Sequence, residues 1–185
     1  MTASERPGAA EWAERLFAAA DATIPCSACL GAFYINQPRC TWCDADRPTF
    51  AMAVFYVWDP NHSPAGGILT KPQRGEHRPV IVGHGALTST TSFIVTRRLA
   101  FDVQGPGADE PVVEVSLSRD WVSLRSLDGR SYPFFSASGD RQTEISDRPQ
   151  TVQLVHRHAS WRLHLGEMGR LHRVLSIVLR PGREA

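Results

Sequence analysis

The sequence has very little net charge and almost no lysine. Its 185 residues carry 20 Lys and Arg against 19 Asp and Glu, and Lys71 is the single lysine. A protein that is bound mainly through phosphates usually has a clear basic excess. The formal net charge of +1 therefore gives no argument for nucleic acid or an acidic membrane surface as the main partner.

A long hydrophobic run is also missing. The longest apolar stretch, residues 50–58, is far shorter than the roughly 20 residues that cross a bilayer. The first residues are charged and lack the apolar centre of a signal peptide. We therefore expect no membrane partner and a cytoplasmic protein, in which thiols stay reduced.

Motifs of common catalytic sites are missing as well. The chain has no G-x-S-x-G, no H-E-x-x-H and no P-loop, and its carboxylates are scattered. His84 lies between two glycines that would let a ligand approach, although a histidine in a turn is the simpler interpretation. His156 and His158 share one face of a predicted strand, where they form either half of a metal site or a solvated pair. His164 and His172 are expected to be exposed. We predict that the protein is not an enzyme.

All four cysteines lie within residues 26–43, and the other 167 residues contain none. Cys26, Cys29, Cys40 and Cys43 follow the spacing C-x2-C-x10-C-x2-C. Each C-x-x-C pair forms a tight turn that points two sulfurs at one centre, and two such turns close a tetrahedral four-thiolate site. The pattern favours structural Zn²⁺ in a zinc-ribbon hairpin.

Three other interpretations of these thiols remain open. Two disulfides would require an oxidising compartment. A redox pair would need one C-x-x-C, usually in a thioredoxin-like context that is missing here. An iron–sulfur cluster also uses four thiolates. Because four protein ligands leave zinc no open position, the predicted site is structural, with Arg39 and Arg47 placed to offset its negative charge.

Aromatic residues surround the cysteines. Phe33, Tyr34 and Ile35 lie between the two pairs, and Trp42 lies between the last two cysteines. We expect them to form the small core that such a short module otherwise lacks. The alternative is that one or two of these aromatic side chains form an exposed contact surface.

Residues 9–21 predict an amphipathic helix before the cysteines. Trp12, Leu16 and Phe17 fall on one apolar stripe at helical spacing. So short a helix is marginally stable by itself. We therefore expect this stripe to dock on the cysteine module or on the domain that follows.

The helix with Glu11-Trp12, the first cysteine pair, Phe33-Tyr34 and the closing Cys-Thr-Trp-Cys together resemble a cysteine module of bacterial serine/threonine kinase-like proteins. Those proteins belong to tellurite-resistance-associated systems that pair a kinase, a phosphatase and a von Willebrand A-domain protein. Their closing pair is typically Cys-Pro-Trp-Cys, and here Thr41 replaces the proline. The resemblance covers about residues 10–47 and implies a zinc-binding accessory module. It implies no kinase activity, because the Gly-rich loop, H-R-D and D-F-G are missing.

The pattern changes to strands after the cysteines. Residues 49–58 predict a strand buried on both faces, and residues 59–78, rich in Pro and Gly, predict a long loop. Apolar segments then recur every 8 to 12 residues or so with turn signals between them, which favours an antiparallel β-sandwich. The predicted fold is mainly β, and its three parts are an N-terminal helix plus zinc ribbon (1–48), a buried strand and linker (49–78) and a β-sandwich domain (79–185).

Three details of the β half follow from its turn signals. Residues 79–87 predict a strand that runs into a Gly-His-Gly turn, and residues 91–103 predict one or two strands. Residues 121–135 predict a hairpin that turns at Asp128-Gly129.

The β half is similar in outline to forkhead-associated and immunoglobulin-like folds. The segment Ser-Arg-Asp-Trp that ends at Trp121 has the serine and arginine of a forkhead-associated site, but Trp121 replaces its histidine. The resemblance therefore implies an architecture and not a phosphopeptide site.

These observations predict a non-catalytic, zinc-binding adaptor with a protein partner, in a bacterial signalling, stress-response or defence assembly. One alternative is a nucleic-acid-binding zinc-ribbon protein that contacts phosphates through Arg97-Arg98 and the arginines near the C-terminus. The second alternative is an enzyme with a site near His84.

Overall fold

The computed structural model describes residues 8–62, 66–73, 75–136, 139, 141–154 and 161–182. Within these residues the elements are, in chain order, α1 (Ala9–Asp21), β1 (Thr23–Pro25), β2 (Ala32–Tyr34), β3 (Phe50–Asp59), β4 (Gly67–Ile68), β5 (Thr70–Gln73), β6 (Glu76–Pro79), β7 (Ile81–Leu87), β8 (Ser92–Thr96), α2 (Arg97–Phe101), β9 (Pro111–Ser118), β10 (Trp121–Ser126), β11 (Tyr132–Phe135), β12 (Gln142–Ile145), β13 (Gln150–Gln153), β14 (Trp161–His164) and β15 (His172–Arg180).

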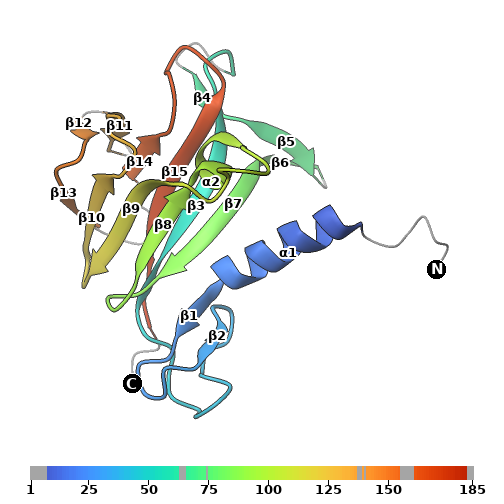
Figure 1. Ribbon diagram of the computed structural model, residues 1–185, viewed down its shortest axis with the longest axis vertical. Helices are drawn as coiled ribbons and strands as arrows, with labels where there is room; N and C mark the ends of the chain where they lie inside the picture. The colour runs from blue at the N-terminus through green and yellow to red at the C-terminus, as the bar shows by residue number, and fades with distance from the viewer. Residues whose placement is uncertain are drawn as a thin grey trace.

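Two antiparallel sheets face each other in a sandwich-like arrangement (Figure 1). The larger sheet has the order β12-β11-β14-β15-β3, and β3 then pairs with both β4 and β7. The smaller sheet has the order β13-β10-β9-β8. The main core lies between them and contains Phe55 and Phe134 from one sheet and Val115 and Leu124 from the other. The predicted fold class is confirmed.

β3 lies at the centre of the larger sheet, between β15 and β7. Ala51, Ala53 and Phe55 are fully buried on the face that turns to the main core. The opposite face is covered at its first residues, where Phe50 and Met52 pack in a second core. The prediction of a strand buried on both faces is therefore right for the start of β3 and for Trp58, which is 8% exposed. Val54 and Tyr56 on the same face are only partly buried, because the cysteine module covers a limited length of the sheet.

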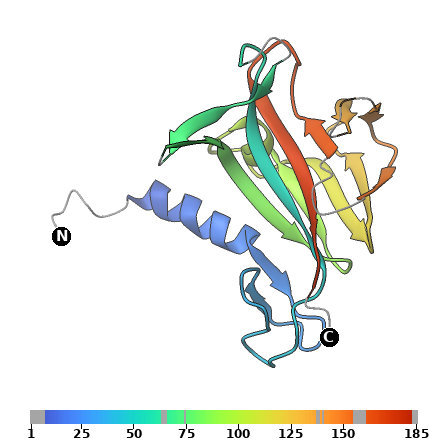
Figure 2. The ribbon, with the colours of Figure 1, turned by 180° about the vertical axis from the view of Figure 1, so that it is seen from behind.

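The cysteine module lies at one end of the larger sheet (Figures 1 and 2). The β1–β2 hairpin supplies Ile24 and Phe33 to the second core, and Ile35 and Phe50 join them. Ala86 of β7 packs against the same cluster. The module therefore rests on the sandwich through its own small core, while α1 extends beside β7 with its N-terminal end away from the sheets.

The segment 59–78, expected as a long loop, contains β4 and the β5–β6 hairpin. β4 pairs with the end of β3, and β5 pairs with β6 around Gly75, whose φ of +83° suits glycine. The residues of this hairpin are mostly exposed on both faces. The strands therefore lack the apolar alternation by which a sequence indicates a strand.

The expected Gly-His-Gly turn is a regular part of β7. A Cβ at Gly83 would lie 2.8 Å from the Leu99 side chain, and a Cβ at Gly85 would lie 2.0 Å from the Phe93 ring. The two glycines therefore permit close packing between layers and do not form a turn. Residues 97–101, expected as strand, form the short helix α2 that brings Leu99 to this contact.

The segment 121–135 is not a hairpin, because β10 belongs to the smaller sheet and β11 to the larger. Asp128 and Gly129 do form a turn between them. The carboxylate of Asp128 accepts hydrogen bonds from Ser126 Oγ at 3.0 Å, from the Arg130 amide at 3.1 Å and from the Tyr132 hydroxyl at 2.6 Å. The turn signal is therefore real, but the chain uses it to cross from one sheet to the other.

Candidate metal centre

The two cysteine pairs lie in backbone turns of the same construction. In the first turn the Leu30 amide donates to the Cys26 carbonyl at 3.0 Å, and in the second the Asp44 amide donates to the Cys40 carbonyl at 3.0 Å. Leu30 and Asp44, each one residue after a pair, have φ of 61° and 58°. This left-handed conformation reverses the chain after each pair, so that both pairs point their sulfurs at one centre.

The four sulfurs lie as a tetrahedral metal centre requires. All four Sγ atoms of the cysteines lie within 4.8 Å of one another. The Sγ atoms of Cys26 and Cys43 are 3.6 Å apart, and those of Cys29 and Cys40 are 3.7 Å apart. Four metal–sulfur bonds of about 2.3 Å in a tetrahedron place the sulfurs about 3.8 Å apart. The donor set and its spacing therefore fit a four-thiolate metal ion, and all four predicted ligands are brought together.

Backbone amides in the turns favour anionic sulfur. The Ala28 amide donates to Cys26 Sγ and the Trp42 amide to Cys40 Sγ, both at 3.4 Å. Hydrogen bonds from the Cys29 and Ala28 amides lower the pKa of the Cys26 thiol to about 6. For Cys43 the Ala45 amide acts in the same direction, but the neighbouring sulfurs and burial raise its pKa to about 12. Four thiols this close do not all ionise without a cation between them.

The centre is built into the second core. Cys26 and Cys40 are buried among its apolar residues, whereas Cys29 and Cys43 are exposed. With four protein ligands a tetrahedral ion has no position for water or substrate. The geometry therefore suits a structural role, in which the ion holds two chain turns against each other.

The aromatic residues of the module divide between core and surface. Phe33 and Ile35 are buried in the second core, as expected. Tyr34 is exposed, and Trp42 is 73% exposed. The prediction of a shared core is therefore wrong for Tyr34 and Trp42, because alternate residues of β2 face opposite ways and Trp42 lies on the outside of its turn.

Trp42 is held in place although it is exposed. Its indole N–H donates to the Ala32 carbonyl at 2.9 Å, and a Cβ at Gly31 would lie 2.6 Å from the indole ring. The ring therefore packs closely against the backbone of Gly31. Leu30, next to Gly31, is 79% exposed. Leu30, Tyr34 and Trp42 together are called the aromatic patch below.

The arginines near the cysteines are engaged by other groups. Arg39 forms ion pairs with Asp44 at 2.8 Å and with Asp46 at 3.5 Å. Arg47 donates to the Ile35 carbonyl at 2.6 Å, and its guanidinium lies 5.1 Å from the centre of the Phe50 ring. Arg39 therefore connects the two ends of the second cysteine turn, and Arg47 connects the module to the start of β3.

The apolar stripe of α1 is exposed, contrary to expectation. Trp12, Leu16 and Phe17 all lie on the surface, and Leu16 is 64% exposed. The end of the helix is held by Arg98, whose guanidinium lies 4.2 Å from the centre of the Phe17 ring and 3.9 Å from the Asp21 carboxylate. Docking therefore involves the last turns of the helix and leaves the first turns without cover from the described residues.

His84 lies half-buried in β7 and lines a cavity of about 440 Å³ together with Asp21 and Arg98. Burial raises the pKa of Asp21, and the charges of Arg98 and His84 partly offset that rise. The described lining of this cavity includes neither serine, threonine, cysteine nor lysine. His156 and His158, the other histidines considered for a metal, lie outside the described residues.

The prediction that His164 and His172 are exposed is wrong. His164 is 2% exposed, because the rings of Phe135 on β11 and Trp58 on β3 lie against it. His172 Nδ1 donates to the Arg170 carbonyl at 2.7 Å, so its Nε2 accepts from His164 Nδ1 at 2.8 Å. Burial lowers the pKa of both imidazoles, that of His164 to about 4, and both are neutral near pH 7.

None of the described helices is long and apolar enough to cross a membrane. Comparison of the chain with models of known families, with curated proteins and with solved structures gives no match. Conclusions about function therefore rest on the chain itself.

Proposed function

We propose that this protein is a non-catalytic, zinc-binding adaptor of the cytoplasm that binds a protein partner. The metal is Zn²⁺, held by Cys26, Cys29, Cys40 and Cys43, and it acts structurally. The spacing of the sulfurs and the closed four-thiolate set support a structural ion, and gathered thiols suit a reducing compartment.

The observation that carries the adaptor function is the aromatic patch, which lies on the two cysteine turns and on β2. Tryptophan and tyrosine are enriched among the residues that contribute most to binding at protein interfaces. Trp42 is exposed and yet fixed by its hydrogen bond to Ala32, so little side-chain entropy is lost when a partner covers it. A closed metal centre that orders a rigid apolar surface suits recognition better than catalysis.

The resemblance of residues 10–47 to the module of kinase-like proteins supports a place in a bacterial signalling or stress-response assembly. In that case the partner is a component of a system that contains a kinase, a phosphatase and a von Willebrand A-domain protein. Genes for such proteins beside the gene for this chain would support this part of the proposal.

The alternative of an enzyme near His84 rests on the cavity that His84 shares with Asp21 and Arg98. The imidazole of His84 and the carboxyl of Asp21 are groups that transfer protons in enzymes. The adaptor function makes no use of either group. The nucleic-acid alternative draws less support, since Arg97 pairs with Glu110 at 2.9 Å and Arg98 lies 3.9 Å from the Asp21 carboxylate.

The metal is tested first, by elemental analysis of the purified protein. About one equivalent of zinc per chain is expected. Iron in its place, or less than about half an equivalent of any metal, would overturn the structural zinc site.

The partner is tested by affinity capture from the native host with three forms of the chain: wild type, W42A and the control W121A. Trp121 is also exposed but lies on β10, outside the module. We expect one protein partner to be captured by wild type and W121A and lost with W42A, while the zinc content stays unchanged. Equal capture by W42A, or capture of nucleic acid that declines steeply with salt, would contradict the proposal.

A further inference from the structure

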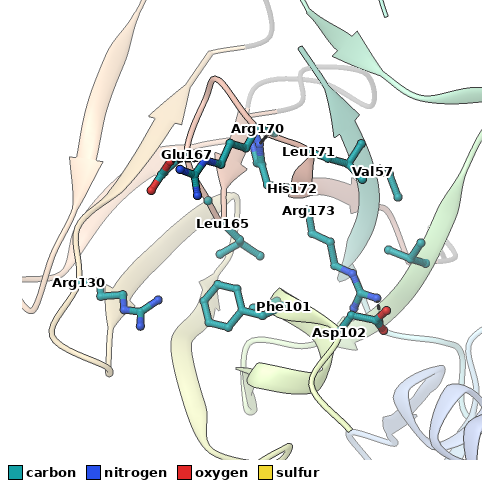
Figure 3. A pocket seen from close by; sticks show the side chains of 13 residues that line it. Val57, Phe101, Asp102, Arg130, Leu165, Glu167, Arg170, Leu171, His172 and Arg173 are labelled. Atoms are coloured by element: carbon teal, nitrogen blue, oxygen red, sulfur yellow. Dashed lines mark hydrogen bonds and ion pairs between the residues drawn. The ribbon is translucent and has the colours of Figure 1, made fainter. Parts of the chain in front are cut away.

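A hollow of about 570 Å³ is lined by side chains from several elements of the sandwich (Figure 3). Its lining includes α2 and the turn between β14 and β15, which lie in the half of the sandwich away from the cysteine module (Figure 1). Its walls come from α2, from the turn between β14 and β15, and from the crossing between β10 and β11. Small-molecule sites in proteins usually occupy roughly 300–1,000 Å³. The hollow is therefore large enough for a small organic molecule.

The inner surface of the hollow is apolar. Leu165 is almost fully buried at its centre, and Phe101 lies beside it (Figure 3). Val57 and Val82 add partly exposed walls, and Leu171 lies exposed at the edge. Burial of such carbon surface under a ligand would contribute about 25 cal/mol per Å² of apolar area removed from water.

Guanidinium groups surround this apolar surface (Figure 3). Arg173 is 15% exposed in its side chain and is fixed, since it donates to the carbonyls of Arg98 and Leu99 at 2.6 and 2.9 Å and to Asp102 at 2.6 Å. It therefore shapes the wall and has little capacity for a ligand.

Arg130 and Arg170 are better placed to meet a ligand. Arg170 is 78% exposed in its side chain and pairs at 3.0 Å with Glu167, which is also exposed. Arg130 lies 3.7 Å from Asp128, and its guanidinium lies 5.6 Å from the centre of the Phe101 ring. The Arg170–Glu167 pair is exposed and the Arg130–Asp128 pair is long, so both pairs are weak and a ligand anion can replace them.

The exposed guanidinium groups of the hollow favour an anion as the ligand. Each arginine of the lining has a carboxylate partner, since Arg130 pairs with Asp128, Arg170 with Glu167 and Arg173 with Asp102. His172 adds no charge near pH 7, and both of its ring nitrogens are already hydrogen-bonded. The guanidinium groups that are open to a ligand are therefore those of Arg130 and Arg170.

We propose that this hollow binds a small organic anion whose apolar body covers Phe101 and Leu165 and whose carboxylate or phosphate head is held by Arg130 and Arg170. Arginine suits both head groups, because its planar fork donates two parallel hydrogen bonds to either. The site is independent of the metal centre, and it gives the chain a small-molecule ligand in addition to its protein partner.

The test is fluorescence titration of the full chain with 8-anilinonaphthalene-1-sulfonate, an aromatic anion, followed by displacement with octanoate, octyl phosphate, octanol and inorganic phosphate. We expect saturable binding of one probe molecule per chain. Octanoate or octyl phosphate should displace the probe at least about tenfold better than octanol, because charged hydrogen bonds are lost with the neutral head. The better of the two anions identifies the head group.

Three variants locate the site. The double variant R130Q/R170Q should weaken probe binding at least about tenfold, and Leu171→Ser should weaken it at least about threefold. The matched control R78Q removes an arginine that is also exposed and also pairs with a glutamate at 3.0 Å, but on β6, and should change binding less than about twofold. Arg130 and Arg170 are exposed, so the double variant should fold normally.

Several outcomes would overturn the proposal. These are no saturable binding, unchanged binding by R130Q/R170Q, an equal loss with R78Q, or displacement by octanol as effective as by the anions. The proposal would also be contradicted if inorganic phosphate displaced the probe as effectively as octyl phosphate at the same concentration. The apolar body of the ligand would then contribute nothing to binding.

Discussion

At the scale of single residues, close packing explains the two glycines of β7. Phe93 and Leu99 occupy the space that side chains at Gly85 and Gly83 would need. A sequence read by its turn propensities assigns such glycines to a turn, because glycine is equally suited to both tasks. The distinction depends on residues eight and sixteen positions further along the chain.

Gly85→Ala should destabilise the protein by about 1–3 kcal/mol, because its Cβ would lie 2.0 Å from the Phe93 ring and the core would have to shift. Chemical denaturation measures the change. Gly169→Ala is the control, because a Cβ there meets nothing within 4 Å. In the F93A background the cost of Gly85→Ala should fall, and an unchanged cost would show that the ring contact is not its cause.

The buried His164 should make stability depend on pH. Its pKa is lowered from 6.5 to about 4 in the folded chain, so the unfolded chain binds more protons between these values. The contribution of the neutral histidine is therefore complete above about pH 6.5 and is lost as the pH falls towards 4.

Urea unfolding of wild type and H164N at pH 7.5 and 4.5 checks this expectation. On lowering the pH, wild type should lose about 2–3 kcal/mol more than H164N. The comparison cancels acid effects on the cysteines, which are the same in both chains. An equal loss in the two proteins would contradict the assignment.

At the scale of elements, α1 differs most from its expected role. Its periodicity predicts a helix, and the helix is present, but its apolar stripe is exposed. Arg98 holds the last turns through Phe17 and Asp21. The first turns therefore form an exposed apolar surface at the end of the helix that is away from the cysteine module (Figure 1).

Leu16→Ser should change the free energy of unfolding by less than about 0.5 kcal/mol, because the side chain is 64% exposed. Ile24→Ala in β1 should cost about 2–5 kcal/mol, because Ile24 is buried in the second core. Thermal and chemical denaturation measure both. A large loss with Leu16→Ser would mean that the stripe is packed in solution.

At the scale of the whole molecule, two cores of different kinds meet along β3. The main core lies between the sheets and uses apolar residues, whereas the second core contains Cys26 and Cys40. The second core is small, and small modules commonly depend on a bound metal for their structure. Metal removal should therefore affect the two parts of the chain unequally.

Treatment with a chelator should increase amide hydrogen exchange in residues 22–47 much more than in β9 and β10. The module then loses its ligand-dependent structure, while the sandwich keeps its own core. Exchange read by mass spectrometry, before and after zinc is restored, checks this. An equal increase throughout the chain would show that the two cores unfold as one unit.

The sequence by itself determined the ligand set, the mainly β class and the helix before the cysteines. These follow from local patterns, namely two C-x-x-C turns, short apolar segments between turn signals, and one helical stripe. The sulfur distances of 3.6 and 3.7 Å join cysteines of different turns, so they depend also on the second core, which holds the two turns together.

Tertiary structure alone decided which side chains are covered. It buries His164 under Trp58 and Phe135, leaves Trp42 and Leu16 exposed, and sends the turn at Asp128 from one sheet to the other. It also brings Arg130 and Arg170 to one hollow from different parts of the chain. The physical reason is that burial and charge depend on contacts between segments far apart in sequence, which no local pattern contains.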